Sequence, residues 1–168
     1  MKIQIIGYSG SGKSTLAKKL AEHYKIPQLY LDNTKFYGDW EERTREEQTK
    51  IVEEFMDKND SWVIDGNYRK IAKRRFEEWD LLIFLDYNRF FCYRQAKKRY
   101  KENKGGSRES CPCEERFNLS FRFWILFQSR NRRKKKQLQD MMDLAKGEKL
   151  VFKNRKQLNA YLESLGIK

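Results

Sequence analysis

A glycine-rich segment near the N-terminus limits the folds open to this chain more than any other feature. Residues Gly7 to Ser14 read GYSGSGKS and fit G-x-x-x-x-G-K-[ST] at every fixed position. An apolar run precedes the segment at residues 2–6, and apolar residues recur at helical spacing after it, up to Tyr24. The sequence therefore predicts a strand, a tight turn and a helix in that order, which is the setting that a phosphate-binding loop requires.

Each fixed residue of this loop has a physical reason to be there. Gly7, Gly10 and Gly12 allow backbone angles that a Cβ atom would forbid, so successive N–H groups can point at phosphate oxygens. The positive end of the following helix also favours an anion. Lys13 supplies a full charge and Ser14 a hydroxyl for Mg²⁺, so ATP and Mg²⁺ are the expected cofactors. The residues expected to bind the nucleotide are Gly7, Ser9, Gly10, Ser11, Gly12, Lys13, Ser14 and Thr15.

Length and charge narrow the class of protein further. The chain has 168 residues, enough for one domain spanning 1–168, and its net charge is +13. Such a surface attracts polyanions, and both nucleotides and nucleic acids fit that description. Cys92, Cys111 and Cys113 cannot all pair, which favours a reducing compartment. The apolar runs are too short for a signal peptide or a bilayer span, so a cytoplasmic protein with no membrane partner is expected. The sequence leaves the oligomeric state open.

The remaining periodicity predicts alternating strands and helices. Short apolar runs predict strands at 2–6, 29–31, 62–64, 81–85 and 150–152. Helices are predicted after the loop, from the Thr44–Glu47 capping box, after Asn88, over about 117–145, and after Asn154. Such alternation implies parallel strands joined by crossover helices. The glycine-containing stretch around 103–117 is interpreted as an inserted loop.

Five segments together resemble a known family. They are GYSGSGKST, LYLD (29–32), WVIDGNYR (62–69), LLIFLDYNR (81–89) and CPCEERFNLSFRFWILF (111–127). The chain is similar to the adenylate-kinase-like branch of P-loop kinases and, more narrowly, to bacterial DNA topology modulation (FlaR-like) proteins. The resemblance implies a three-layer α/β/α fold with a five-stranded parallel sheet and a mobile lid at about 103–117.

Three polar residues near predicted strand ends are candidates for chemistry, because ligands of open α/β sheets gather there. Asp32 resembles the acidic residue with which similar kinases hold or deprotonate an acceptor hydroxyl; a turn or helix cap is the alternative. Asp65 resembles the Asp-Gly pair of nucleoside monophosphate kinases and is the expected Mg²⁺ ligand together with Ser14; a simple Asp-Gly turn is the alternative. Arg69 is expected to grip an acceptor anion, with a solvated side chain as the alternative. The expected catalytic residues are therefore Lys13, Asp32, Asp65 and Arg69.

Other residue types carry weaker predictions. Phosphoryl transfer needs cations near the moving charge, and the candidates around the proposed lid are Arg94, Arg99, Arg108, Arg122, Arg130 and Arg132. Cys111 and Cys113 stand at C-x-C spacing without a second pair, which disfavours structural zinc. The aromatic residues Phe121, Phe123, Trp124 and Phe127 are interpreted as core and lid packing.

Three functions fit these observations. The first is an ATP-dependent kinase of a nucleoside, a nucleotide or another small hydroxylated or anionic metabolite. The second is an ATP-switched nucleic-acid-binding protein, which the basic run at 130–136 favours, although no base-reading module is visible. The third is a nucleotide-binding module without turnover. The acceptor itself is not identified by the sequence.

Overall fold

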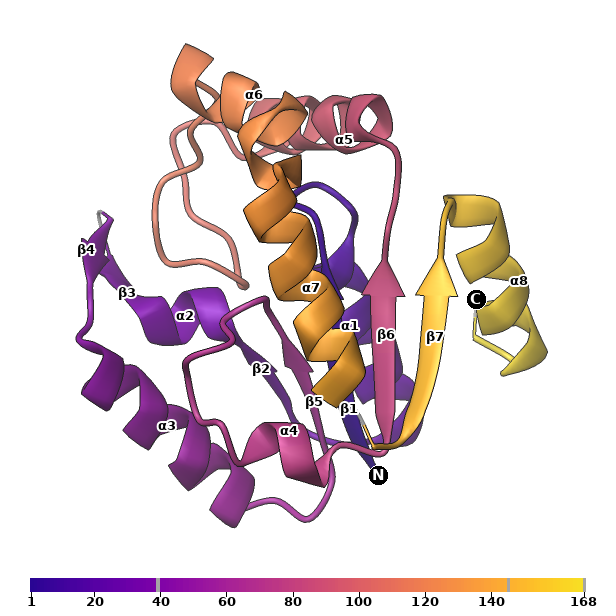
Figure 1. The fold of residues 1–168 in the computed structure, drawn as a ribbon. Coiled ribbons are helices and arrows are strands. Elements are labelled where there is room, and N and C mark those ends of the chain that lie inside the picture. The colour runs from indigo at the N-terminus through magenta and orange to yellow at the C-terminus, as the bar shows by residue number, and fades with distance from the viewer. Residues whose placement is uncertain (39, 145, 168) are drawn as a thin grey trace.

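The computed structural model describes residues 1–38, 40–144 and 146–167. Its central sheet has five parallel strands in the order β2-β5-β1-β6-β7, and a small antiparallel hairpin lies apart from it (Figure 1). The strands are β1 (Lys2–Gly7), β2 (Gln28–Tyr30), β3 (Phe36–Gly38), β4 (Glu41–Glu42), β5 (Trp62–Asp65), β6 (Leu81–Leu85) and β7 (Glu148–Phe152).

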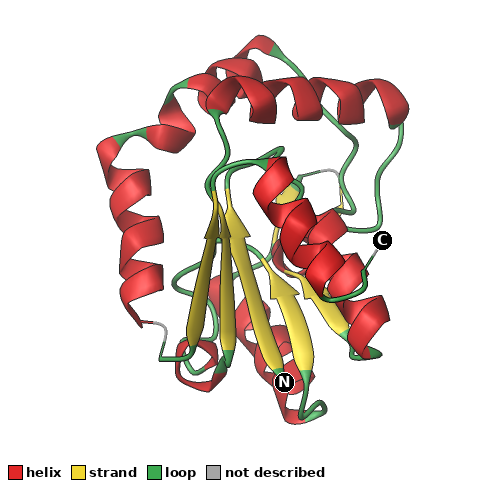
Figure 2. Ribbon diagram, turned by 90° about the vertical axis from the view of Figure 1, so that its right-hand side faces the viewer, coloured by secondary structure: helices red, strands yellow, loops and turns green. Residues whose placement is uncertain are grey.

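Helices cover both faces of the sheet, so the three-layer α/β/α architecture predicted from the sequence is confirmed. Figure 1 shows α7 in front of the sheet and α1 behind it, and Figure 2 shows the sheet between these helical layers. The helices are α1 (Lys13–Tyr24), α2 (Leu31–Lys35), α3 (Arg45–Asp57), α4 (Arg75–Glu78), α5 (Arg89–Glu102), α6 (Leu119–Leu126), the 3₁₀ turn η1 (Gln128–Arg130), α7 (Arg132–Leu144) and α8 (Arg155–Ser164). Within the described residues, no helix is both long enough and apolar enough to cross a bilayer.

The central position of β1 explains its unbroken apolar run. Ile3, Ile5 and Ile6 are fully buried, because β1 pairs with β5 on one side and β6 on the other and carries helices on both faces. This arrangement places the end of β1, and with it Gly7, at the carboxyl edge of the sheet. The phosphate loop thus lies where open α/β sheets bind ligands.

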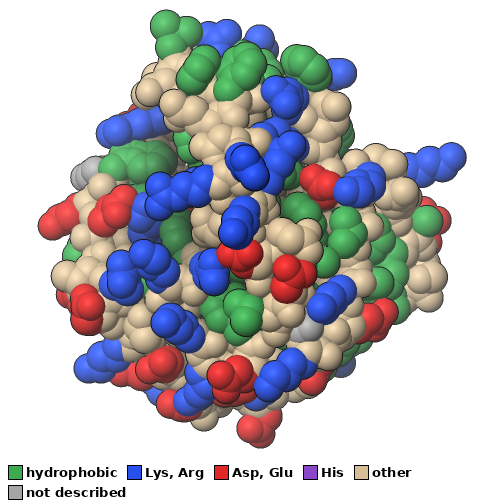
Figure 3. Space-filling view, in the orientation of Figure 1, with side chains coloured by type: hydrophobic (Ala, Val, Ile, Leu, Met, Phe, Trp, Pro, Cys, Tyr) green, Lys and Arg blue, Asp and Glu red, His purple; other side chains and the backbone are tan. Residues whose placement is uncertain are grey.

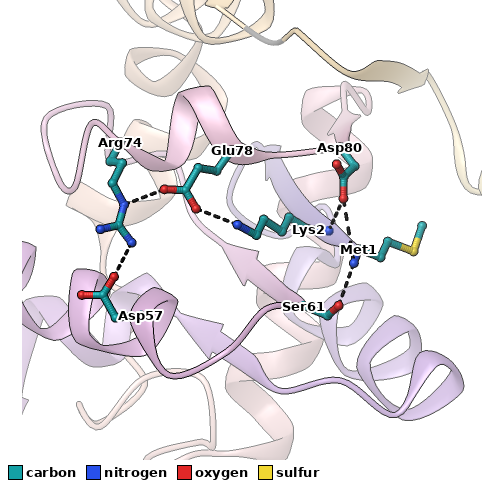
Figure 4. Close-up of polar contacts among 7 residues, drawn as sticks. All are labelled: Met1, Lys2, Asp57, Ser61, Arg74, Glu78 and Asp80. Carbon is teal, nitrogen blue, oxygen red and sulfur yellow. Dashed lines mark hydrogen bonds and ion pairs between the residues drawn. The ribbon is translucent and has the colours of Figure 1, made fainter.

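A polar network lies at the other end of the strands, where their amino termini are. Arg74 pairs with both Asp57 and Glu78 at 2.6 Å, and Glu78 also accepts from Lys2 Nζ at 2.7 Å (Figure 4). The carboxylate of Asp80 accepts from the backbone N–H of Lys2 at 2.7 Å. Exposed ion pairs contribute little stability individually, but this network ties α3 and α4 to the start of β1.

The predicted long helix over about 117–145 is wrong. The chain forms α6, then η1, then α7, with Ala145 outside the described residues. Asn131 has extended backbone angles, and its side chain accepts from the N–H of Lys134, so it begins a new helix. Gly147 follows α7 and permits a close approach of two backbone segments, since a Cβ there would lie 2.1 Å from Asp80 O.

Candidate active site

A cavity of about 920 Å³ lies at the carboxyl edge of the sheet. The phosphate loop forms its floor, and Asp32, Asp65, the insert after α5, and α6 contribute to its walls. Ligand sites of small-molecule enzymes commonly fall within about 300–1,000 Å³, so the cavity has room for a nucleotide and a small acceptor.

The glycines of the phosphate loop adopt the conformations that the motif predicts. Gly10 and Gly12 have φ angles of +80° and +95°, in the region that residues with a Cβ rarely adopt. A Cβ on Gly10 would also lie 2.2 Å from the carbonyl oxygen of Cys92, so α5 packs directly onto the loop. Gly12 stands at the N-terminal cap of α1, which directs the positive end of that helix at the loop.

Lys13 and Ser14 begin α1 and face the same space. The ammonium group of Lys13 lies 3.3 Å from the carbonyl oxygen of Tyr8, back across the loop. The hydroxyl of Ser14 donates to Asp65 Oδ2 at 2.7 Å. The motif residue and the strand-end carboxylate, 51 positions apart in sequence, therefore meet at one point.

Asp65 is a buried carboxyl group with an unused oxygen. Its exposed fraction is 6%, and Oδ1 has no hydrogen-bond partner among the described residues. Burial raises the pKa of this carboxyl, while nearby Lys13 and the Ser14 hydroxyl lower it in part. An unpaired carboxylate oxygen beside a serine hydroxyl is a donor set that suits Mg²⁺, so the residues present fit the expected ion.

The segment after β5 holds the phosphate loop in place, a role that the sequence alone did not predict. The Asn67 side chain accepts from Gly7 N–H at 3.0 Å and donates to Gly7 O at 2.7 Å. This paired contact extends the sheet hydrogen bonding beyond β5 onto the start of the loop. The only sequence signal was the place of Asn67, two residues after a strand-end aspartate.

Asp32 lies in the first turn of α2 and lines the cavity. Its Oδ1 accepts from the Tyr68 hydroxyl at 2.6 Å. The pKa of the Tyr68 phenol is raised, mainly by burial and next by the nearby Asp32 carboxylate. The phenol therefore stays protonated and can donate a hydrogen bond. This bond fixes the orientation of the Asp32 side chain.

Arg69 is the one predicted catalytic residue that the structure does not bring to the cavity. Its guanidinium lies 2.5 Å from Asp140 Oδ2 on α7, and its side chain is 47% exposed. A grip on an acceptor anion stays a prediction, and it would require this ion pair to open.

Two other arginines supply the positive charge near the site. Arg99 from α5 and Arg108 from the insert both pair with the buried Glu115, at 3.0 and 2.6 Å. All three residues line the cavity. Because one carboxylate serves two guanidinium groups, the trio keeps a net charge of +1 facing the ligand space.

Arg130 contacts two tyrosine residues, Tyr8 and Tyr87. Its guanidinium carbon lies 3.6 Å from the ring centroid of Tyr8, and its Nη2 donates to Tyr87 O at 2.6 Å. Arg122 instead donates to the Tyr93 hydroxyl, at 2.8 Å. The sequence could select the arginines near the insert but could not rank them.

The insert at about 103–117 crosses to the side of the cavity that holds Asp32. Glu109 accepts from Lys18 at 2.9 Å and from Gln28 at 3.1 Å, and its carbonyl oxygen accepts from Asn33 at 2.7 Å. Cys111 and Cys113 are buried as free thiols against Phe36. These contacts place the insert over the ligand space; its motion as a lid remains a prediction.

The aromatic residues of α6 divide between two faces. Phe121 and Trp124 line the cavity, with stacked rings 5.9 Å apart, which agrees with the packing role expected of them. Phe123 and Phe127 are 54% and 52% exposed, so the expectation of buried packing is wrong for these two. Phe123 and Phe127 are four positions apart, so they lie on one face of the helix and contact each other, with ring centroids 4.9 Å apart.

Solved structures with this fold include two kinases. A shikimate kinase from Bacteroides thetaiotaomicron is 15% identical, with a TM-score of 0.59 over 98% of this chain and 96% of that one. A deoxyadenosine kinase from M. mycoides, solved with the products dCMP and a flexible dCDP, is also 15% identical, with a TM-score of 0.54 over 99% of both chains. An uncharacterized protein from Eubacterium ventriosum is 14% identical, with a TM-score of 0.51 over 99% of this chain and 98% of that one.

At these identities the similarity shows a shared fold and nothing more specific. No curated protein sequence matches the chain. The family model described as "AAA domain" matches residues 3–115, which are 113 of the 168 residues and include the phosphate loop, Asp32, Asp65 and Asn67. The chain therefore belongs to the AAA domain family, and its fold is that of the P-loop kinases.

Proposed function

We propose that the protein is an ATP- and Mg²⁺-dependent phosphotransferase that acts on a nucleoside, a nucleotide or another small metabolite in the cytoplasm. The observation that carries this proposal is the convergence of Lys13, the Ser14–Asp65 pair and Asp32 on one cavity. A module that only binds nucleotide needs Lys13 and the Ser14–Asp65 pair. It does not need a third group such as the Asp32 carboxylate held in position in the same cavity.

The roles follow from the geometry. The loop N–H groups and Lys13 hold the phosphates of ATP. Ser14 and Asp65 would hold Mg²⁺, which neutralises charge on the phosphate oxygens when it is bound. Asp32 accepts the proton of the acceptor hydroxyl as that oxygen bonds to the γ-phosphorus and the bond from the γ-phosphorus to the β–γ bridging oxygen breaks. Arg99 and Arg108 stabilise the negative charge that the γ-phosphoryl oxygens carry.

The insert has a proposed role as a lid. It lies across the ligand space through Glu109 and the Cys111–Cys113 segment. A lid that encloses ATP and acceptor together excludes water and so limits hydrolysis.

A phosphotransfer screen tests the proposal. ATP-Mg²⁺ is offered with nucleosides, nucleotides and small hydroxylated acids, and ADP formation above the acceptor-free rate is measured. We expect at least one acceptor class to raise the rate in the intact protein and to have no effect with Asp32→Asn. Tight ATP binding with no acceptor-dependent turnover across the screen would instead favour the module without turnover.

A second candidate is nucleic-acid binding controlled by ATP, as the resemblance to DNA topology modulation proteins suggests. The supporting observation is the basic run at 130–136, whose members on α7 are exposed and gather on one face of the molecule (Figure 3). Arg132, Lys135 and Lys136 also line a shallow hollow. A partner role for DNA requires affinity that ATP changes, whereas charge alone predicts binding that ATP leaves unchanged.

A further inference from the structure

The strand β7 leaves one edge of the central sheet open. It is the last strand in the order β2-β5-β1-β6-β7, and no described residue pairs with its far side. Figure 2 is drawn from the side of the molecule that carries β7, and the edge lies between α7 and α8. An unpaired edge is a template for another strand unless a protein blocks it. The opposite edge strand, β2, is contacted by the insert through Gln28 and Glu109.

The backbone of β7 shows which groups point out of the sheet. Glu148 N–H donates to Asp80 O, and Asp86 N–H donates to Phe152 O, so the backbone groups of Glu148 and Phe152 face β6. Backbone direction alternates along a strand, so Leu150 also faces β6. The N–H and C=O groups of Lys149 and Val151 therefore point to the open edge.

Several side chains around this edge are apolar and moderately exposed. Val151 is 40% exposed and Leu144 at the end of α7 is 46% exposed, while Leu150 is half-buried. The strand contains no proline and no bulge in its register with β6. It thus lacks most devices that keep an edge from pairing, apart from the charges of Glu148 and Lys149.

Charge near the edge favours a second copy of this chain over a polyanion. The charged residues from the end of α7 through the middle of β7 are Asp143, Lys146, Glu148 and Lys149, which sum to zero. Lys153 is already paired with Asp86. The chain as a whole carries +13, so this segment is locally neutral on a strongly basic protein, and the nearest unbalanced charges counted along the chain are Arg155 and Lys156 at the start of α8. Two neutral edges can approach each other where two basic faces repel.

We propose that β7 pairs antiparallel with β7 of a second copy across a two-fold axis at Leu150, which joins two five-stranded sheets into one. In this register Lys149 lies opposite the partner's Val151, and Val151 opposite the partner's Lys149. Both residues point their backbone groups outward, so each pair exchanges two hydrogen bonds, as antiparallel geometry requires. Leu150 meets its own counterpart in the non-hydrogen-bonded pair at the centre, where side chains approach most closely.

The expected association is weak and reversible. Stable interfaces bury at least about 1,000 Å² in total, and a pairing of three residues needs the flanking side chains of α7 and α8 to reach that area. The net charge of each copy also opposes contact, so added salt should raise the dimer fraction. Binding to a polyanion would respond to salt in the opposite direction.

A charge-swap series at the edge tests the register. The molar mass of the full-length protein is followed by sedimentation equilibrium at several concentrations, for the intact protein, V151E, V151K and K149E/V151K. We expect reversible dimers for the intact protein and for V151E, because the new carboxylate lies opposite the partner's Lys149. V151K places two ammonium groups opposite each other and should lower the association constant at least tenfold, and K149E/V151K should restore it.

The V151P variant separates pairing from folding. The Val151 N–H makes no bond to β6, so proline should leave the chain's own sheet intact while removing an outward donor. We expect a monomer with an unchanged circular dichroism spectrum. A monomeric intact protein at every concentration, or equal association of V151E and V151K, would overturn the proposal. The measurement does not involve ATP, so its outcome is independent of the proposed kinase activity.

Discussion

At the scale of single residues, Lys13 is the side chain on which turnover depends most. Its ammonium group lies at the phosphate loop, and its one hydrogen bond among the described residues goes to the carbonyl oxygen of Tyr8 in the same loop. Loss of one group that stabilises transition-state charge typically lowers kcat about 10²–10³-fold. We expect Lys13→Ala to show a loss of that size in acceptor-dependent ADP formation, with an unchanged melting temperature. Lys156→Ala, at an exposed position on α8, is the matched control and should retain full activity.

Asp65 is predicted to lower the free energy of unfolding of the metal-free protein while it provides a ligand for Mg²⁺. Its pKa is raised in the folded protein, so the folded state holds its proton more tightly than the unfolded state does. The free energy of unfolding then falls as pH rises through the interval between the unfolded and the folded pKa, and the loss persists at neutral pH. Asp65→Asn removes that charge and keeps an acceptor for Ser14.

We therefore expect Asp65→Asn to melt at a higher temperature than the intact protein at pH 7 without Mg²⁺, and to bind ATP-Mg²⁺ more weakly. Each 1 kcal/mol corresponds to about 2–4 °C for a chain of this size. Calorimetric melts and ATP titrations at pH 4 and pH 7 measure both effects, with the exposed Asp60→Asn as control. A melting temperature equal to that of the intact protein at both pH values would contradict the prediction.

At the scale of elements, the insert at about 103–117 is predicted to order further when ligands bind. Its polar contacts through Glu109 are partly exposed, whereas Arg99 and Arg108 face the cavity and would gain phosphate partners. Hydrogen exchange of amides 103–117 should slow in the presence of a bisubstrate analogue. The helix α3 lies outside the cavity lining and serves as the internal reference. Equal exchange in the free and bound states would remove the lid from the mechanism.

The elements also show how far sequence reasoning reaches. Local signals identified the phosphate loop, the Thr44–Glu47 capping box and the Asn88 cap, because each depends on residues a few positions apart. The same signals misled at 117–145, where helical spacing continued through Asn131 although the chain turned. The partners of Arg69 and Asn67 depend on contacts between distant segments, which no local pattern encodes.

At the scale of the whole molecule, the distribution of charge separates incidental from specific binding of nucleic acid. The chain carries +13, and the stretch 116–139 contains eight basic residues and no acidic one. Contact with phosphates releases counterions, so affinity should fall steeply with added salt and should not depend on sequence. At physiological ionic strength we expect dissociation constants no tighter than about micromolar.

The final prediction locates this binding on α7. K135E/K136E and K50E/K58E change the net charge equally, but only the first pair lies in the basic run. If phosphates bind to that run, K135E/K136E should weaken duplex binding more than K50E/K58E does. It should also reduce the slope of log affinity against log salt by about 0.9 for each phosphate that the variant no longer neutralises.

Titrations with two unrelated duplexes, each with and without ATP-Mg²⁺, make the comparison. Equal weakening by both pairs would mean that net charge alone attracts DNA. Binding that prefers one duplex and changes with ATP would instead make the nucleic-acid switch the leading function, because charge without base contacts cannot distinguish sequences.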